Sequence, residues 1–333
     1  MTSYEIVRRA IEFGSPERIP IRFASMGIDD TYGVPLQAAA GWEPVAPEVD
    51  EWGCLWHRPD PASGIVNMGQ PKGHPLTDLD HLDDYPWPDP TEDNRYALIE
   101  EALAGAGDKY VMCGVGFTFF ERMHYLYGMD NLFVAMYEQP EKVHDLAERV
   151  VSYPLGIAHE LGQRFGGRIH GFGMTDDWGT QVTHFVQIPM WRTFFKERYI
   201  RLFGAIHEAG MHAWMHSCGH VNEVIGEWID CKLNVVNLQQ PRNLGIEEIG
   251  ARCRGKICFE TTCDIQMTLP WRPAEEIREE ARLLLEHWAT PEGGFILSDY
   301  GPGEAIGVVP EKKRIMLEAF LMLAAPGVEI PPL

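Results

Sequence analysis

The sequence predicts an α/β protein that folds as one (β/α)8 TIM barrel over residues 1–333, with an irregular N-terminal cap at 27–95 over the C-terminal mouth of the barrel. Three observations support this fold. Apolar, strand-like runs alternate with helix-like segments from residue 95 onward. The strands are apolar throughout, as expected for parallel strands that are covered on both faces. Polar side chains follow these strands on their C-terminal sides, where barrel enzymes carry their active sites.

The first 95 residues are expected to hold one helix, one strand and the cap. Tyr4–Phe13 has the pattern of a short helix that ends at Gly14, and "RIPIRF" at 18–23 is the first strand. Residues 27–95 are rich in Gly, Pro, Asp and Trp and show little helical periodicity. We therefore expect an irregular cap insertion, which could contain a hairpin around Pro59–Gly64.

The remaining chain alternates between the two element types. In the helix after residue 190, Trp191, Phe194 and Phe195 begin an apolar face with a three-to-four spacing, and the last helix begins at Pro310, a position that suits proline. The expected helices are 95–107, 118–164 with breaks near 128 and 140, 191–206, 221–229, 246–253, 273–288 and one from 310. The expected strands are 109–116, 167–179, 211–219, 233–241, 256–264 and 294–301.

These runs and the first strand make about seven strands, and an eighth could lie within 111–165. The count favours a barrel over an open, doubly wound sheet. No G-x-G-x-x-G loop follows the first strand, which argues against a dinucleotide-binding fold.

Composition excludes several classes of function. A net charge of −21 argues against nucleic acid as a ligand, and no apolar run reaches the length of roughly 18 residues that a membrane span needs. The N-terminus lacks the apolar centre of a signal peptide, and the seven scattered cysteines do not resemble a disulfide framework. We therefore expect a cytoplasmic protein that binds neither nucleic acid nor a membrane.

The stretch "HAWMHSCGHV" at 212–221 contains the most specific chemical signal. In an extended chain His216 and Cys218 point to the same side, so a nitrogen and a sulfur face one spot. Zinc takes these ligand types. The alternative is a buried histidine that packs beside a small buried cysteine.

Polar groups end the other expected strands as well, and they are the remaining candidate site residues. Their location favours function, although Asp177 could instead cap a helix and Gln239 could lie in a solvated loop. These groups are Asp176 and Asp177, then Asn237, Gln239 and Gln240, then Glu260 and Asp264, and finally Ser298, Asp299 and Tyr300.

Seven short segments, spread over nearly the whole chain, resemble segments of one known protein superfamily and occur in the same order as they do there. They are "AIEFGSPERIPI", "DEWGCLW", "LYGMDNLFVAMYEQPEKV", "DDWGTQ", "HSCG", "CDIQMTLP" and "GGFILSDYG". Together they resemble the superfamily of uroporphyrinogen decarboxylase and the cobalamin-dependent methyltransferases, whose fold is a (β/α)8 barrel.

The resemblance points to the methyltransferase branch. Uroporphyrinogen decarboxylases carry an arginine-rich N-terminal motif for the substrate's carboxylates, whereas "RFASMGIDDTYG" here has only Arg22. The pair formed by His216 and Cys218 matches the H-x-C zinc pair of the methyltransferases. The segments "DEWGCLW" and "DDWGTQ" look like those of proteins that demethylate methoxylated aromatics and pass the methyl group to a corrinoid protein.

The resemblance implies two cofactors: zinc, and a corrinoid (cobalamin) carried by a separate protein, because this chain has no recognisable cobalamin motif. Thiol-methylating members have a third zinc ligand, a cysteine, in the last loop, but this chain has none after Cys263. We expect Glu304 in that loop to be the third ligand, with Glu260 as the second choice.

Catalysis would require orientation of the methoxy group and stabilisation of negative charge on the departing oxygen. We expect Asp177 and Glu260 to be catalytic, by hydrogen bonding or as general acids. Trp178, Gln239 and Tyr300 are the expected substrate-binding residues, although the aromatic rings could instead pack beneath the cap.

Three functions therefore compete. The first is zinc-assisted methyl transfer from a methoxylated aromatic to the cobalt of a corrinoid protein. The second is metal-free decarboxylation of a multi-carboxylate substrate, which would need a basic pocket. The third is a non-catalytic binding protein, which a closed, apolar barrel mouth would favour.

Overall fold

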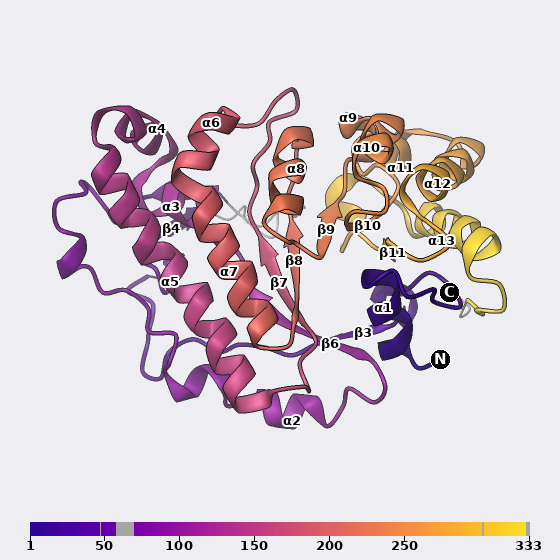
Figure 1. Ribbon diagram of the computed structural model, residues 1–333, viewed down its shortest axis with the longest axis horizontal. Helices are drawn as coiled ribbons and strands as arrows, with labels where there is room; N and C mark the ends of the chain where they lie inside the picture. The colour runs from indigo at the N-terminus through magenta and orange to yellow at the C-terminus, as the bar shows by residue number, and fades with distance from the viewer. Residues whose placement is uncertain (47, 58–69, 302, 331–333) are drawn as a thin grey trace.

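Eight parallel strands form a nearly closed barrel in the computed structural model, which describes residues 1–46, 48–57, 70–301 and 303–330 (Figure 1). The strands follow one another in space as β1–β11–β10–β9–β8–β7–β6–β3, and β2 pairs antiparallel with β1. This arrangement confirms the predicted fold class. The strand bounds are β1 Ile21–Phe23, β2 Ile28–Asp29, β3 Thr31–Gly33, β6 Tyr110–Val115, β7 Gly171–Thr175, β8 His212–His216, β9 Val235–Leu238, β10 Cys258–Thr261 and β11 Phe295–Ser298.

Strands β1 and β3 meet where the barrel closes. The backbone N–H of Asp30 donates to the carbonyl of Ile21 at 2.7 Å, and the Asp30 carboxylate accepts from the N–H of Ile21 at 2.8 Å. Arg18 pairs with the same carboxylate at 2.6 Å. The eighth strand is therefore β3, which lies inside the segment predicted as cap and not within 111–165. Three residues are too few to show a strand period in sequence.

Helices cover the outside of the sheet, and several lie side by side, as α5 and α7 do in Figure 1. The predicted breaks near Gly128 and Pro140 are confirmed, because α3, α4 and α5 are separate helices. The helix bounds are α1 Ser3–Ile11, α2 Ile99–Leu103, α3 Phe120–Tyr127, α4 Met129–Glu138, α5 Pro140–Phe165, α6 Ile188–Trp191, α7 Glu197–Glu208, α8 Asn222–Asp230, α9 Pro241–Leu244, α10 Ile246–Cys253, α11 Thr268–Trp271, α12 Ala274–Trp288 and α13 Pro310–Ala324.

The N-terminal end of the barrel is closed by its own small core. Val7 and Ile11 on α1 pack against residues near the strand starts, such as Tyr110 and Trp214, and the members of this cluster are buried. A ligand therefore has to approach the barrel interior from the opposite end, where the strands end.

The cap expected at 27–95 contributes its first residues to the sheet, through β2 and β3, and is irregular for most of the rest. Strands β4 Leu55–His57 and β5 Gln70–Gly73 pair antiparallel, so a hairpin is present. Its expected turn at Pro59–Gly64 lies outside the described residues. The buried side chain of Arg95 stabilises this region through a bidentate ion pair with Glu51, with N–O distances of 2.5 and 3.0 Å.

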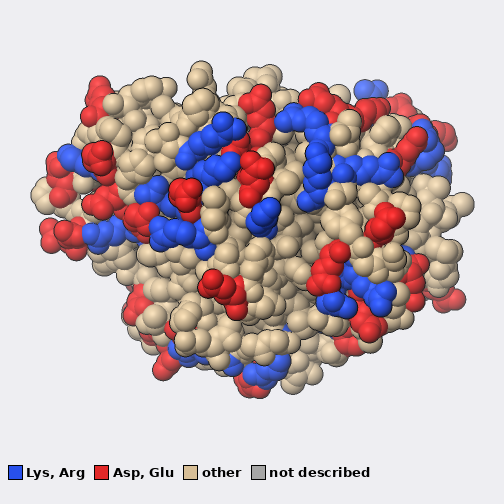
Figure 2. All heavy atoms as spheres, in the orientation of Figure 1, with Lys and Arg blue, Asp and Glu red and all other residues tan. Residues whose placement is uncertain are grey.

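The surface carries both signs of charge. Figure 2 shows Lys and Arg interspersed with Asp and Glu across the face in view. Among the described residues, no helix combines the length and the apolar character that a membrane span requires.

Candidate metal centre

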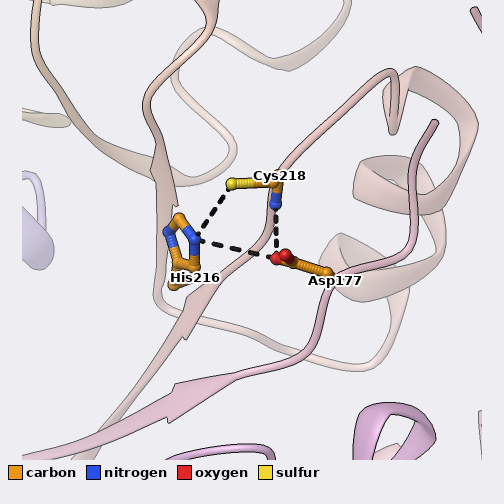
Figure 3. A group of neighbouring side chains, drawn as sticks. All are labelled: Asp177, His216 and Cys218. Atoms are coloured by element: carbon orange, nitrogen blue, oxygen red, sulfur yellow. Dashed lines mark hydrogen bonds and ion pairs between the residues drawn. The ribbon is translucent and has the colours of Figure 1, made fainter. Parts of the chain in front are cut away.

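His216, Cys218 and Asp177 converge at the C-terminal ends of two neighbouring strands (Figure 3). His216 is the last residue of β8, Cys218 follows in the next loop, and Asp177 follows β7. The Nε2 of His216 lies 3.3 Å from the Sγ of Cys218 and 3.7 Å from Oδ1 of Asp177. The spacing argument therefore correctly placed the imidazole beside the thiol.

Two loops hold these groups together. The backbone N–H of Cys218 donates to Oδ1 of Asp177 at 2.7 Å, and the N–H of His220 donates to the carbonyl of Thr180 at 2.7 Å. Gly219 has a φ of +83°, and a Cβ on it would lie 2.2 Å from the carbonyl oxygen of Gly179. Only glycine allows this close approach, which places the thiol beside the carboxylate.

Asn237 orients the imidazole ring of His216 through the ring nitrogen that faces away from Cys218 and Asp177. Nδ1 of His216 is hydrogen-bonded to Oδ1 of Asn237 at 2.6 Å. An amide oxygen only accepts, so Nδ1 carries the proton and the lone pair of Nε2 faces Cys218 and Asp177. Metal-binding histidines are commonly held in this way.

The donor set fits zinc. One imidazole nitrogen, one sulfur and one carboxylate oxygen lie within 4.8 Å of one another. Two ligand atoms bound tetrahedrally at zinc distances of 2.0–2.3 Å would lie roughly 3.3–3.8 Å apart, which matches the separations at His216. Three protein ligands would leave the fourth position open, as in catalytic zinc sites.

The Cys218 thiol is protonated unless a cation is present. Burial, followed by the nearby charges of Asp177 and Glu121, raises the pKa of this thiol above its ordinary value. A bound divalent cation reverses that effect and deprotonates a coordinating thiol. Zinc binding is therefore expected to release a proton.

The expected third ligands lie elsewhere or cannot be placed. Glu260 is buried and pairs with Arg22 at 2.6 Å, and it is not a member of the cluster. Glu304 belongs to the short helix η6 Gly303–Ile306, but its side chain lies outside the described part of the structure. Among the described side chains, Asp177 is the one that completes a group of three potential donors with His216 and Cys218.

Trp178 corrects another expectation. Its side chain is fully buried, stacks on Phe120 at 4.2 Å and donates from Nε1 to the hydroxyl of Tyr199 at 3.0 Å. It therefore belongs to the hydrophobic core and has no surface to offer a substrate. The sequence could not distinguish the two roles, because a tryptophan that follows a polar strand end looks the same whether it packs in the core or contacts a substrate.

Gln239 and Tyr300 lie nearer to the expected site. Gln239 lines the barrel interior. Tyr300 is half-buried and follows β11 at the end of the barrel that carries the cluster, and burial raises the pKa of its hydroxyl. Their expected roles in substrate binding stay predictions.

Two cavities adjoin the cluster. The first, called the funnel, lies inside the barrel, has a volume of about 450 Å3 and is lined by His216. The second, called the side cavity, has a volume of about 720 Å3 and is lined by Asp177. Its other walls come from α3, the start of α4, the hairpin strands and the loop after β7.

Sequence reasoning missed Glu121, which also lines the side cavity. Its carboxyl is buried and accepts from the Tyr125 hydroxyl at 2.9 Å and from the Thr175 hydroxyl at 3.1 Å. Burial, and then the charges of Asp177 and Asp176, raise the pKa of Glu121 to about 8. The sequence signal was a glutamate early in a helix, which is common on helix surfaces.

Asp176 has a structural role. It is fully buried and accepts from the backbone N–H groups of Phe120 and Glu121, at 3.1 and 2.8 Å, and from the hydroxyl of Tyr199. Burial raises its pKa to about 7. It fixes the start of α3 and thereby one wall of the side cavity.

Gly219→Ala should weaken zinc binding at least tenfold. The substitution places a side chain at positive φ, which costs about 1–2 kcal/mol, and pushes against the Gly179 backbone. Zinc affinity can be measured by competition with a chromophoric chelator. Gly226→Ala is the control, because its Cβ would have nothing within 4 Å. Wild-type affinity in Gly219→Ala would show that the close approach does not position the ligands.

His124 should make the fold sensitive to acid. Burial lowers its pKa to about 3, against an ordinary value of 6.5. Between these values the unfolded chain binds a proton that the folded chain does not, so stability falls as pH falls from 6.5 towards 3, by up to about 1.4 kcal/mol per pH unit.

His124→Gln should therefore lose less stability than the wild type between pH 7 and pH 5, with a difference of up to about 2 kcal/mol. Urea unfolding at both pH values measures this difference. The exposed His159 offers the control His159→Gln, which should behave as the wild type does. An equal loss in wild type and His124→Gln would contradict the argument.

The chain is similar to one protein family and to several solved structures. A family model described as Uroporphyrinogen decarboxylase (URO-D) matches residues 65–320. Among solved structures, a methyltransferase from Methanosarcina mazei superimposes with a TM-score of 0.68 at 12% identity, over 96% of this chain and 98% of that chain. Xylanase 10B from Thermotoga maritima gives a TM-score of 0.43 at 10% identity, over 94% and 98%. No curated protein matches the sequence.

Proposed function

The chain belongs to the uroporphyrinogen decarboxylase family, and within it we propose a methyltransferase that moves a methyl group from a methoxylated aromatic to the cobalt of a separate corrinoid protein, with zinc assistance. The observation that carries this proposal is the cluster of His216, Cys218 and Asp177, with donor separations that suit zinc. The methyltransferase fold neighbour agrees with it.

The residues of the chain would prepare the site for an ether oxygen. Asn237 holds the His216 ring, and the hydrogen bond from the Cys218 backbone holds the Asp177 carboxylate. When bound, zinc supplies a Lewis acid that stabilises negative charge on the departing oxygen. We assign Asp177 to the donor set rather than to general acid catalysis.

Glu260 would have a supporting role. Its ion pair with Arg22 at 2.6 Å lies in the funnel, and Arg22 also covers the face of Trp214 at 5.2 Å. A carboxylate that is committed to an arginine in this way is poorly placed to deliver a proton. We propose that it holds Arg22 in position at the funnel wall.

The alternative functions have less support. Decarboxylation of a multi-carboxylate substrate calls for a cluster of cations, but Arg22 is the only Lys or Arg among the described residues that line the funnel, and Glu260 pairs with it. A non-catalytic barrel was expected to have a closed, apolar mouth, whereas the funnel is about 450 Å3 in volume and polar side chains such as His216, Asn237 and Gln239 are part of its lining.

The test is methyl transfer itself. Zinc-loaded protein is mixed with cob(I)alamin and a panel of methoxyarenes, and the released phenol and the loss of the Co(I) absorbance are measured together. We expect at least one donor to give both signals in equal amounts. If no donor reacts, and a porphyrinogen loses carboxylate as CO2 in the parallel assay, the decarboxylase reading replaces this one.

A further inference from the structure

We propose that the side cavity is the binding pocket of the methyl donor, and that it takes an aromatic ring without a carboxylate, either uncharged or cationic. This inference rests on the proposed methyl transfer. It is carried by the position of the cavity, its aromatic walls and the charges that line it.

Each cavity meets the cluster at a different residue. His216 lines the funnel, whereas Asp177 lines the side cavity. An ether oxygen at the cluster has its ring and its methyl group about 120° apart, so the two groups need separate spaces. A ring in the side cavity would leave the methyl group to face the funnel, from which the methyl acceptor can attack in line.

The side cavity has the walls that a ring requires. Trp56, Phe117 and Tyr125 pack on one another with centroids 5.0–5.1 Å apart and form an aromatic wall, and Phe185 contributes from the loop after β7. A volume of about 720 Å3 is in the usual range for small-molecule sites. Among the described residues that line the funnel, Trp214 is the only Phe, Tyr or Trp.

The charges of the side cavity are unsuited to an anion. Glu121 and Asp177 line it together with Asp130 at its exposed rim, and none of the described lining residues is Lys or Arg. The nearby Arg122 is paired with Asp50 at 2.9 Å. A carboxylate on the ring would lose its hydration without gaining a Lys or Arg partner among the described residues of the cavity.

Glu121 shows how this cavity accommodates a carboxyl group. It is buried, and its oxygens accept from the hydroxyl groups of Tyr125 and Thr175 and have no ion pair with a described Lys or Arg. A ring carboxylate placed beside it would meet the same environment. An ammonium group or a hydroxyl on the ring would instead find carboxyl oxygens to bind.

The first experiment compares three donors that share one ring, 2-methoxyphenol carrying a 4-hydroxymethyl, a 4-aminomethyl or a 4-carboxylate group. Binding of each to the zinc-loaded protein is measured by calorimetry, without an acceptor, so the result does not depend on turnover. We expect the hydroxymethyl and aminomethyl compounds to bind at least tenfold more tightly than the carboxylate. Equal or tighter binding of the carboxylate would overturn the proposal.

The second experiment locates the ring. Phe185→Ala should weaken binding of the hydroxymethyl compound about tenfold, whereas Ser25→Ala, which changes a residue that lines the funnel, should leave that binding unchanged. Asp130→Lys should reduce the ratio of the affinity for the hydroxymethyl compound to the affinity for the carboxylate. Asp29→Asn, which changes a charge in the funnel, should leave this ratio unchanged. If the funnel variants alone change donor binding, the ring binds in the funnel. If donors bind as expected but no methyl is transferred, the pocket stands and the proposed reaction fails.

Discussion

Cys218→Ala is expected to lose zinc and methyl transfer together. The thiol is one of three donors within 4.8 Å of one another, and its removal leaves one imidazole and one carboxylate, too few to hold zinc tightly. We expect affinity to fall roughly a hundredfold or more, beyond the loss seen when only supporting residues are changed. The rate of methyl transfer at limiting zinc should fall in parallel.

The control for this prediction is Cys253→Ala. Cys253 is also buried, but it lies on α10 outside the cluster, so its loss should affect stability and leave zinc content intact. Zinc per chain is measured after dialysis, and far-ultraviolet circular dichroism reports on the fold. If folded Cys218→Ala still binds one zinc per chain, Cys218 is not a zinc ligand and the proposed metal site is wrong.

The barrel could be predicted from the sequence because its signals are local and repeated. The apolar runs that became β7 to β11 are each bounded by turns and followed by an amphipathic segment. The eighth strand could not be predicted from the sequence. It is only three residues long, Thr31–Gly33, and its position is fixed by a contact between Asp30 and β1. Such a contact between separate segments leaves no local pattern.

The same reasoning explains the candidate site. The two-residue rule is local, so it correctly paired His216 with Cys218. Asp177 joins them because Gly179 and Gly219 allow two loops to touch, and that contact depends on the register of β7 and β8. Burial is equally non-local, which is why Trp178 was assigned to the substrate and Glu121 was missed.

Asp177→Asn is expected to lower zinc affinity at least tenfold while leaving the fold unchanged. The amide oxygen of asparagine can still accept from the Cys218 backbone N–H, so the loops stay in contact, but a neutral amide is a poor zinc ligand. Asp130→Asn is the matched control, because it removes a carboxylate at the rim of the side cavity, outside the cluster.

Glu304→Ala distinguishes the geometric assignment from the one based on sequence. If Asp177 is the third ligand, Glu304→Ala keeps its zinc, and in the cobalt-substituted protein it keeps the visible spectrum of the wild type. Asp177→Asn should change that spectrum, because the ligand field of the metal changes, while the thiolate-to-cobalt band from Cys218 persists. If Glu304→Ala loses zinc and Asp177→Asn keeps it, the acidic residue of the last loop completes the site and Asp177 acts on the substrate instead.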